Sequence, residues 1–306
     1  MPEPSVAEVI PARFADVEAQ IARIDADVCA TDGFGALGDA IWLDLEHPGA
    51  DSAGFLVDGR AYGHIARRDN AAPDQWALGL AVVLDARADG TRRALVDAAI
   101  RHVAAHGGGR VVLWVFGANA DDDADLATVG LRPARDLFEM RVTLPVDRRP
   151  QWPESVNVRR FEVGVDEAAW LEVNNRAFAG HAEQGGWTTT TLARRTAEPW
   201  FDPGLFLLAD DPDGLAGFIW MKVHAADDRN PSLGEIYVVG VDTRAQGTGL
   251  GRALAIAGLE VVNARGIDTG MLFCAADNTP ALKLYTSLGF TVHRVDRAYE
   301  CEVASS

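Results

Sequence analysis

The sequence has few lysines, few cysteines and no long apolar run. Lys222 and Lys283 are the two lysines, so almost all of the 28 basic residues are arginines. The three cysteines, Cys29, Cys274 and Cys301, have no CxxC spacing, which argues against a disulfide framework and a structural zinc site. No stretch reaches the roughly 18 apolar residues that span a bilayer, so we expect no membrane segment.

Basic charge is also scarce. The formal net charge is −17, with 28 Lys and Arg against 45 Asp and Glu, whereas binding to a phosphate backbone needs the opposite excess. The first residues are acidic and lack the basic-then-apolar order of a secretory signal, so we expect a cytoplasmic protein. With 306 residues, of which 48% are hydrophobic, the chain is long enough for two domains with sizeable cores.

The chain contains an internal repeat. Residues 92–119 resemble residues 251–278 at an offset of 159, which places Asn119 on Asn278. Upstream, residues 81–91 resemble residues 238–248 at an offset of 157. Because order, residue type and spacing agree, the sequence predicts two copies of one fold.

A proline-rich segment joins the two copies. Residues 145–155 hold three prolines and no periodic apolar pattern, which is typical of a linker. We therefore predict a first domain at residues 1–147 and a second at residues 156–306, with a linker at 148–155.

Each copy mixes helices and strands. An N-terminal helix is expected at 12–29 in the first copy and at 167–178 in the second. The second copy continues with strands at 205–209, 215–223, 235–241, 270–274, 290–295 and 299–303, and with helices at 252–265 and from 279. Hairpins come early and helical crossovers later, so we predict an α/β (mixed α+β) fold: a mixed, twisted sheet flanked by helices.

A glycine-rich loop lies between the strand at 235–241 and the helix at 252–265. Its core, Gln246-Gly-Thr-Gly-Leu-Gly251, has three alternate glycines, which let backbone N–H groups surround an anion. The N-terminus of the following helix adds a partial positive charge. The loop predicts a pyrophosphate site, although a tight turn into a helix would use the same residues. The Walker pattern is absent, and the loop lies too late in its domain for a dinucleotide fingerprint.

The motif Gln246-x-x-Gly249-x-Gly251 resembles the acetyl-CoA pyrophosphate loop of the GNAT acyltransferases. Asn278, Tyr285 and the pair Gly289-Phe290 resemble the last motif of the same superfamily. Within it, the tandem arrangement and the segments VNNRAFAGHAEQGGW (173–187) and LGEIYVVGV (233–241) resemble the mycothiol synthases. The likeness is close over the second half of the chain and loose over the first.

This resemblance implies acetyl transfer from acetyl-CoA, as co-substrate, to the cysteinyl α-amine of a small thiol sugar, cysteinyl-glucosaminyl-inositol. Three segments would contact acetyl-CoA. They contain Val239, Gly240 and Val241; Gln246, Gly247, Thr248, Gly249, Leu250, Gly251 and Arg252; and Asn278, Thr279, Pro280, Ala281, Leu282 and Lys283.

The resemblance also implies the acceptor site. Glu183, Lys222 and Glu235 would hold the thiol sugar, with Glu235 also the base, directly or through water, and Tyr285 the acid. These roles suit the chemistry, because an α-amine has a pKa of about 7.7–8.0 and a tyrosine, at about 10, can protonate a thiolate. Phe273 would also contact the substrate. At this position the family has an aromatic side chain with a hydroxyl group.

A nearby acid of the family is replaced by Ala275, so the departures concern substrate fit rather than the reaction type. Each proposed residue also has an ordinary structural alternative. Glu235 could form a surface salt bridge at a strand end, and Tyr285 could pack at the rim of the core. Lys222 could be a solvated strand end, and Glu183 an exposed loop acid.

The first copy lacks the corresponding chemistry. Its loop is two residues shorter, Leu78 replaces Glu235, and Leu126 replaces Tyr285. We therefore predict that the first domain is a degenerate GNAT domain that does not catalyse and binds acetyl-CoA poorly, if at all. We expect it to form one wall of the active cleft. Asp39 falls where the family places a substrate-contacting acid, although a helix-capping acid is the simpler interpretation.

Two other functions stay open. A tandem GNAT enzyme could acetylate another amine, such as an aminoglycoside or a protein N-terminus, and a two-domain acetyl-CoA sensor would not be an enzyme. We expect a monomer whose partners are acetyl-CoA and a small thiol sugar, with no metal, nucleic acid or membrane.

Overall fold

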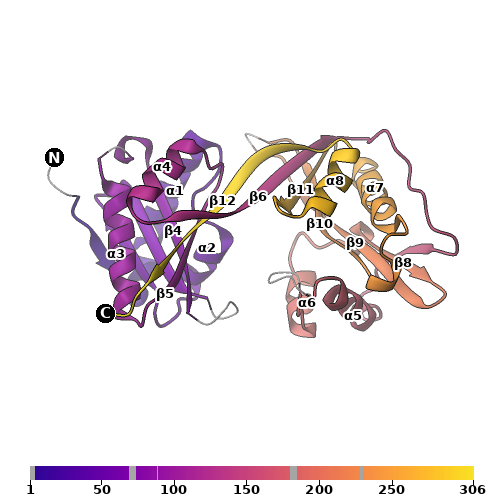
Figure 1. Ribbon diagram of the computed structural model, residues 1–306, viewed down its shortest axis with the longest axis horizontal. Coiled ribbons are helices and arrows are strands. Elements are labelled where there is room, and N and C mark those ends of the chain that lie inside the picture. Colours follow the sequence, from indigo (N-terminus) through magenta and orange to yellow (C-terminus); the bar gives the residue numbers. More distant parts are fainter. Residues whose placement is uncertain (1–3, 69–73, 88, 180–184, 228–229) are drawn as a thin grey trace. The chain divides into compact units, whose positions relative to one another are not determined.

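The chain forms two compact units. One consists of Met1–Leu137 with Arg294–Ser306, and the other of Phe138–His293. Two long strands, β6 (Arg132–Thr143) and β12 (Thr291–Val303), carry the chain between the units (Figure 1). The computed structural model describes residues 4–68, 74–87, 89–179, 185–227 and 230–306.

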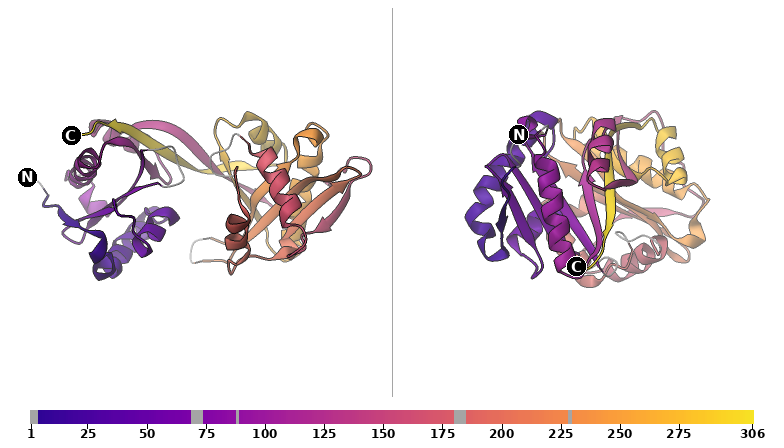
Figure 2. Two further views of the ribbon diagram at one scale, coloured as in Figure 1. Left: turned by 90° about the horizontal axis from the view of Figure 1, so that it is seen from below. Right: turned by 60° about the vertical axis from the view of Figure 1, so that its left-hand side comes forward.

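The first unit is a sheet with helices on both faces. Its strands follow the order β1-β2-β3-β4-β5-β12-β6, and β4 and β5 run parallel. Figure 2 shows α3 lying along the strands, while α1 and α2 supply a separate apolar cluster. The elements are β1 (Ala7–Val9), η1 (Pro11–Arg13), α1 (Phe14–Asp32), α2 (Asp39–Glu46), β2 (Ala53–Val57), β3 (Ala61–Arg67), β4 (Gln75–Val82), η2 (Leu84–Ala86), α3 (Thr91–Ala105), β5 (Gly109–Val115) and α4 (Ala120–Thr128).

The second unit repeats this plan. Its strand order is β6-β11-β10-β9-β8-β7, and β10 and β11 run parallel. Its apolar clusters hold α7 and α8 against one face of the sheet, and α5 and α6 against the other. The elements are β7 (Asn157–Arg160), α5 (Glu167–Ala177), α6 (Thr189–Thr196), η3 (Pro203–Leu205), β8 (Phe206–Asp211), β9 (Gly214–His224), β10 (Leu233–Val241), η4 (Thr243–Ala245), α7 (Leu250–Asn263), β11 (Thr269–Ala275) and α8 (Thr279–Ser287).

Helix α7 lies unusually close to the sheet. Its apolar side chains pack on β9 and β10, and Gly258 faces the sheet, where an added Cβ would lie 2.7 Å from both Ile219 and Met221. A side chain at this position would need Ile219 and Met221 to move. The glycine therefore allows this part of α7 to lie directly on β9.

The two units exchange strands. Residues 297–303 of β12 pair with β5, and Tyr299 is fully buried in the core of the first unit. Arg297 binds Asp136 at 2.6 Å and Asp123 at 2.7 Å. In the opposite direction, the second half of β6 supplies Met140 and Val142 to the core of the second unit. The compact units in space therefore differ from the two repeats of the sequence, and the division at residues 147 and 156 stays a prediction.

The predicted break between two strands in the C-terminal segment is wrong. The sequence predicts separate strands at 290–295 and 299–303, but the structure has one strand, β12, across both. The polar residues between them looked like a turn. In the structure Asp296 is buried and accepts a hydrogen bond from the Gly117 N–H, and Arg297 forms the ion pairs described above.

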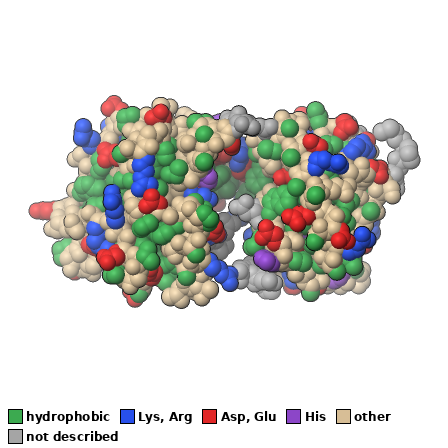
Figure 3. Space-filling model, turned by 180° about the vertical axis from the view of Figure 1, so that it is seen from behind, with side chains coloured by type: hydrophobic (Ala, Val, Ile, Leu, Met, Phe, Trp, Pro, Cys, Tyr) green, Lys and Arg blue, Asp and Glu red, His purple; other side chains and the backbone are tan. Residues whose placement is uncertain are grey.

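The surface charge and the length of the helices bear on two expectations from the composition. On the face drawn in Figure 3, acidic and basic side chains of the described residues are interspersed, without a broad basic area. Among the described helices, none has the length and apolar character that a membrane span needs.

Candidate active site

Strands β10 and β11 separate partway along their length. They pair in parallel at Gly234 and Glu235, and no further pair joins them among the described residues, although β10 continues to Val241. The pairing of β10 with β9 shifts register between Ile236 and Val238, which is typical of a β-bulge. The edge of β10 that faces β11 therefore has free backbone groups over residues 236–241, which include the predicted acetyl-CoA contacts at 239–241.

The glycine loop follows directly. Gly247 and Gly249 have φ angles of +79° and +90°, and an added Cβ would meet nothing within 4 Å at either residue. Gly249 is the N-cap of α7 and offers no side-chain cap. Within the described part of the chain, the N–H groups of residues 247–252 donate no backbone hydrogen bond. Open space before several free donors at a helix N-terminus fits a diphosphate.

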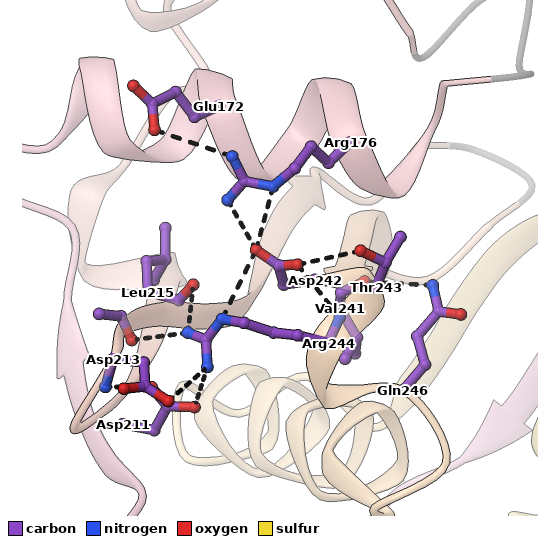
Figure 4. Close-up of polar contacts among 11 residues, drawn as sticks. Glu172, Arg176, Asp211, Asp213, Leu215, Val241, Asp242, Thr243, Arg244 and Gln246 are labelled. Carbon is purple, nitrogen blue, oxygen red and sulfur yellow. Dashed lines mark hydrogen bonds and ion pairs between the residues drawn. The ribbon is translucent and has the colours of Figure 1, made fainter.

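A buried carboxylate fixes the start of this loop. Asp242 is 3% exposed and binds the Arg176 guanidinium of α5 at 2.6 Å. It also accepts from the N–H of Arg244, whose guanidinium binds Asp211 at 2.5 Å (Figure 4). Gln246 donates to the Val241 carbonyl at 3.4 Å. The network connects α5, the hairpin β8–β9 and the loop.

The network is sensitive to acid. Burial alone would raise the pKa of Asp242, but the hydrogen bonds from Arg176 and from the Arg244 N–H lower it below its ordinary value of 3.8. Because the folded state depresses this pKa, the stabilisation is present above about pH 4 and is lost as the pH falls through the folded-state pKa.

We expect Asp242→Ala to weaken the loop. Removing the carboxylate takes away the buried acceptor of Arg176 and of the Arg244 N–H, which costs about 1–3 kcal/mol, and the KM for acetyl-CoA should rise several-fold. Urea unfolding and steady-state kinetics measure the two effects. Glu172→Ala is the matched control, since Glu172 contacts the same Arg176 at 3.8 Å but is 74% exposed. Equal behaviour of the two variants would contradict the anchoring role.

Glu235 and Lys222 lie on the sheet face covered by α5 and α6. They are directly opposite each other in the antiparallel pair β9–β10. Glu235 is 8% exposed, and its Oε2 lies 2.6 Å from Nε2 of His224. The predicted base is therefore a buried carboxylate with one oxygen bound by a histidine.

Lys222 is surrounded by aromatic rings. Its Nζ lies 4.8 Å from the Trp200 ring centroid and 5.9 Å from that of Tyr237. Among the described residues no carboxylate forms an ion pair with this ammonium within 4.0 Å. Burial raises the pKa of Tyr237, with Arg195 opposing and Glu235 adding to the shift. A cation held by ring faces without a counter-ion suits a ligand that carries hydroxyl groups.

Tyr285 belongs to α8 and lies in the core on the other face of the sheet. It is 7% exposed, and its ring centroid lies 5.7 Å from that of Phe290. Burial, together with nearby Cys274, raises the pKa of Tyr285 above its ordinary value of 10.0. The phenol is therefore protonated at neutral pH, and burial makes it a weaker acid than a free tyrosine. Burial also raises the pKa of Cys274, to about 11.

The remaining predicted acetyl-CoA residues begin α8. The Asn278 side chain caps the helix by accepting from the Ala281 N–H at 3.2 Å. Thr279, Pro280 and Lys283 are exposed, whereas Leu282 is half-buried against the core. Arg252 of α7 donates to the Ser287 hydroxyl at 2.7 Å and so ties the two helices together.

The other predicted substrate residues are Phe273, Asp39 and Glu183. Phe273 is 41% exposed on β11. Asp39 is the first residue of α2 in the first unit. Glu183 lies outside the described residues. Their roles stay predictions.

The first unit has the same framework with different side chains. Leu78 forms the last pair between β4 and β5, as Glu235 does between β10 and β11. Gly90 is the N-cap of α3 with φ +85°, like Gly249 of α7. Leu126, at the position of Tyr285, is fully buried. The geometry thus matches the offsets predicted from the repeat.

Sequence reasoning missed His224, Trp200 and Tyr237. A signal existed for His224, because it lies two residues after Lys222 on the same strand and so on the same face. Trp200 gave no signal, since it comes from a segment after α6. Within the described residues, no group of three or more His, Cys, Asp or Glu side chains could hold a metal ion.

Comparison with known proteins identifies the fold. The profile of the Acetyltransferase (GNAT) family matches residues 168–290. Two solved structures share the fold over 99% of this chain: a tandem GNAT protein from the clavulanic acid biosynthesis pathway (TM-score 0.72, 16% identity, 100% of that chain) and a GCN5-related N-acetyltransferase from Sphaerobacter thermophilus (TM-score 0.70, 24% identity, 96% of that chain). The predicted tandem GNAT fold is confirmed.

Curated relatives match nearly the whole chain. The mycothiol acetyltransferase of Nocardia farcinica is 42% identical over 90% of this chain and 90% of its own length. Those of Thermobispora bispora (42% identical, 93% and 95%) and Mycobacterium marinum (36% identical, 93% of each) are similar. The chain therefore belongs to the mycothiol acetyltransferase family of GNAT N-acetyltransferases.

Proposed function

We propose that the protein transfers the acetyl group of acetyl-CoA to the cysteinyl α-amine of cysteinyl-glucosaminyl-inositol, which forms mycothiol. The observation that carries the proposal is the buried Glu235, which lies where β10 and β11 begin to separate and opposite Lys222. Family membership supports the choice of acceptor.

Each step uses a residue of the second unit. Acetyl-CoA supplies the thioester, and the free N–H groups of residues 247–252 would hold its diphosphate. Glu235 takes a proton from the substrate ammonium, directly or through water, and frees the amine to attack the carbonyl. Backbone N–H groups of residues 239–241 stabilise the oxyanion. Tyr285 then gives its proton to the departing thiolate, the nitrogen loses its second proton, which restores the phenol directly or through water, and Glu235 releases its proton to solvent.

Lys222 and its aromatic neighbours are proposed to receive the sugar and inositol hydroxyls. The ammonium donates to hydroxyl oxygens, while Trp200 and Tyr237 contribute apolar ring surface. Positioning the amine beside the thioester supplies most of the acceleration, since alignment can contribute roughly 7–11 kcal/mol.

We propose that the first unit does not catalyse. The gap between β4 and β5 leads into a cavity of about 330 Å³, but both arginines that line it are bound to carboxylates. Arg87 binds Asp32 at 2.6 Å, and Arg92, which stands where the second unit has Gly251, binds Asp125 at 2.9 Å. Neutralised arginines give a phosphate little attraction.

The test is mass-spectrometric detection of product from purified protein, acetyl-CoA and the cysteinyl sugar. We expect a single acetyl group on the α-amine and release of one CoA per product. An aminoglycoside and a peptide with a free N-terminus are run in parallel. Preferred acetylation of either would favour a different acceptor, and binding of acetyl-CoA without substrate-dependent CoA release would favour a sensor.

A further inference from the structure

His224 reaches Glu235 across two strands. In the antiparallel pair β9–β10, Lys222 is opposite Glu235 and His224 is opposite Leu233. His224 is thus the diagonal neighbour of Glu235 on the same face, within reach of long side chains. The separation of 2.6 Å between Nε2 and Oε2 is that of a strong, charge-assisted hydrogen bond.

Lys222 does not bind Glu235 in place of His224. Lys222 is directly opposite Glu235, yet its Nζ lies over the Trp200 ring at 4.8 Å, and no ion pair joins it to Glu235 within 4.0 Å in the described part of the chain. The histidine is therefore the group that fixes the carboxylate. With Oε2 occupied, Oε1 is left for the substrate ammonium or its water.

The contact matters because Glu235 is buried. A buried carboxylate can act as a base only if one of its oxygens is free and aimed at the proton that it takes. An N–H donor at Oε2 holds the side chain in one orientation. In the neutral imidazole this requires the proton on Nε2. The His224 side chain is 34% exposed, so solvent reaches the ring.

We propose that His224 is a positioning residue for the reaction, which holds Glu235 in place and directs Oε1 toward the amine. The inference rests on the proposed function of Glu235. Other charged or titratable groups near the pair are Lys222 of β9, Tyr237 of β10, and Arg195 and Glu198 beside Tyr237.

Two variants separate the roles of the imidazole. His224→Leu removes the donor at similar size, and we expect kcat/KM for the amine to fall about 10–100-fold at neutral pH, a part of the 10²–10⁴ that a general base supplies. The loss should fall on kcat rather than on the KM for the amine. His224→Gln retains an N–H donor and should stay within about threefold of the unaltered protein. The KM for acetyl-CoA should not change in either variant.

Asp210→Asn is the matched control. Asp210 accepts a diagonal cross-strand contact from Arg159 at 2.6 Å in the same unit, on β8, which β9 separates from β10. The variant should change thermal stability and leave kcat unchanged. If His224→Leu keeps the kcat of the unaltered protein, or if the Leu and Gln variants behave alike, the positioning role is wrong. Absence of acetylation by the unaltered protein would instead reject the proposed function.

Discussion

Glu235→Gln lowers kcat/KM by about 10²–10⁴-fold at neutral pH if this carboxylate is the general base. The amide preserves the size of the side chain and can still contact His224, but it cannot accept the ammonium proton. Because the substrate α-amine ionises near pH 7.7–8.0, the deficit should shrink as the pH rises and the amine becomes free without assistance. Initial rates of CoA release between pH 6 and pH 9.5, a range of about two units around that pKa, measure both effects.

The control for this experiment is Glu260→Gln, which alters an exposed carboxylate on α7 and should retain full activity. A Glu235→Gln variant with nearly unchanged rates would remove Glu235 from the mechanism.

Removing residues 294–306 should unfold the first unit, although these residues are the last of the chain. They carry the part of β12 that pairs with β5, the buried Tyr299 and the double ion pair of Arg297. We expect amide hydrogen exchange to lose protection throughout β2–β5 and α3. The single change Tyr299→Ala should cost about 3–5 kcal/mol, as for other buried aromatic rings.

A shorter truncation provides the comparison. Deleting residues 304–306 removes the hydrogen bonds of Ser306 to the Ala104 carbonyl but leaves β12 intact, so protection in the first unit should persist. If the longer truncation also preserves protection, β12 is not needed for the first sheet, and the exchange of strands has no energetic importance.

Local features of the site were predictable because they depend on local chemistry. Three alternate glycines before an amphipathic segment indicate a loop that opens a helix, and Gly249 is indeed the N-cap of α7. The internal offsets also located the first-unit counterparts, since Leu78 and Glu235 occupy the same place in their sheets.

Contacts that depend on register were not predictable. The bond between His224 and Glu235 needs the β9–β10 alignment, which no short motif specifies. The bulge beside Tyr237 breaks the alternation of an apolar strand that reads as continuous. The exchange of β6 and β12 could not be predicted from the sequence either, because an apolar strand has the same pattern whichever sheet it joins.

The strand exchange has a consequence for synthesis of the protein. Domains of a long chain usually fold in order as they leave the ribosome. Here the first unit lacks an interior strand until Arg294–Ser306 has emerged, after the whole of the second unit has been synthesised. The nascent first unit must therefore wait with an incomplete sheet, and its folding is completed only after the residues of the second unit have left the ribosome.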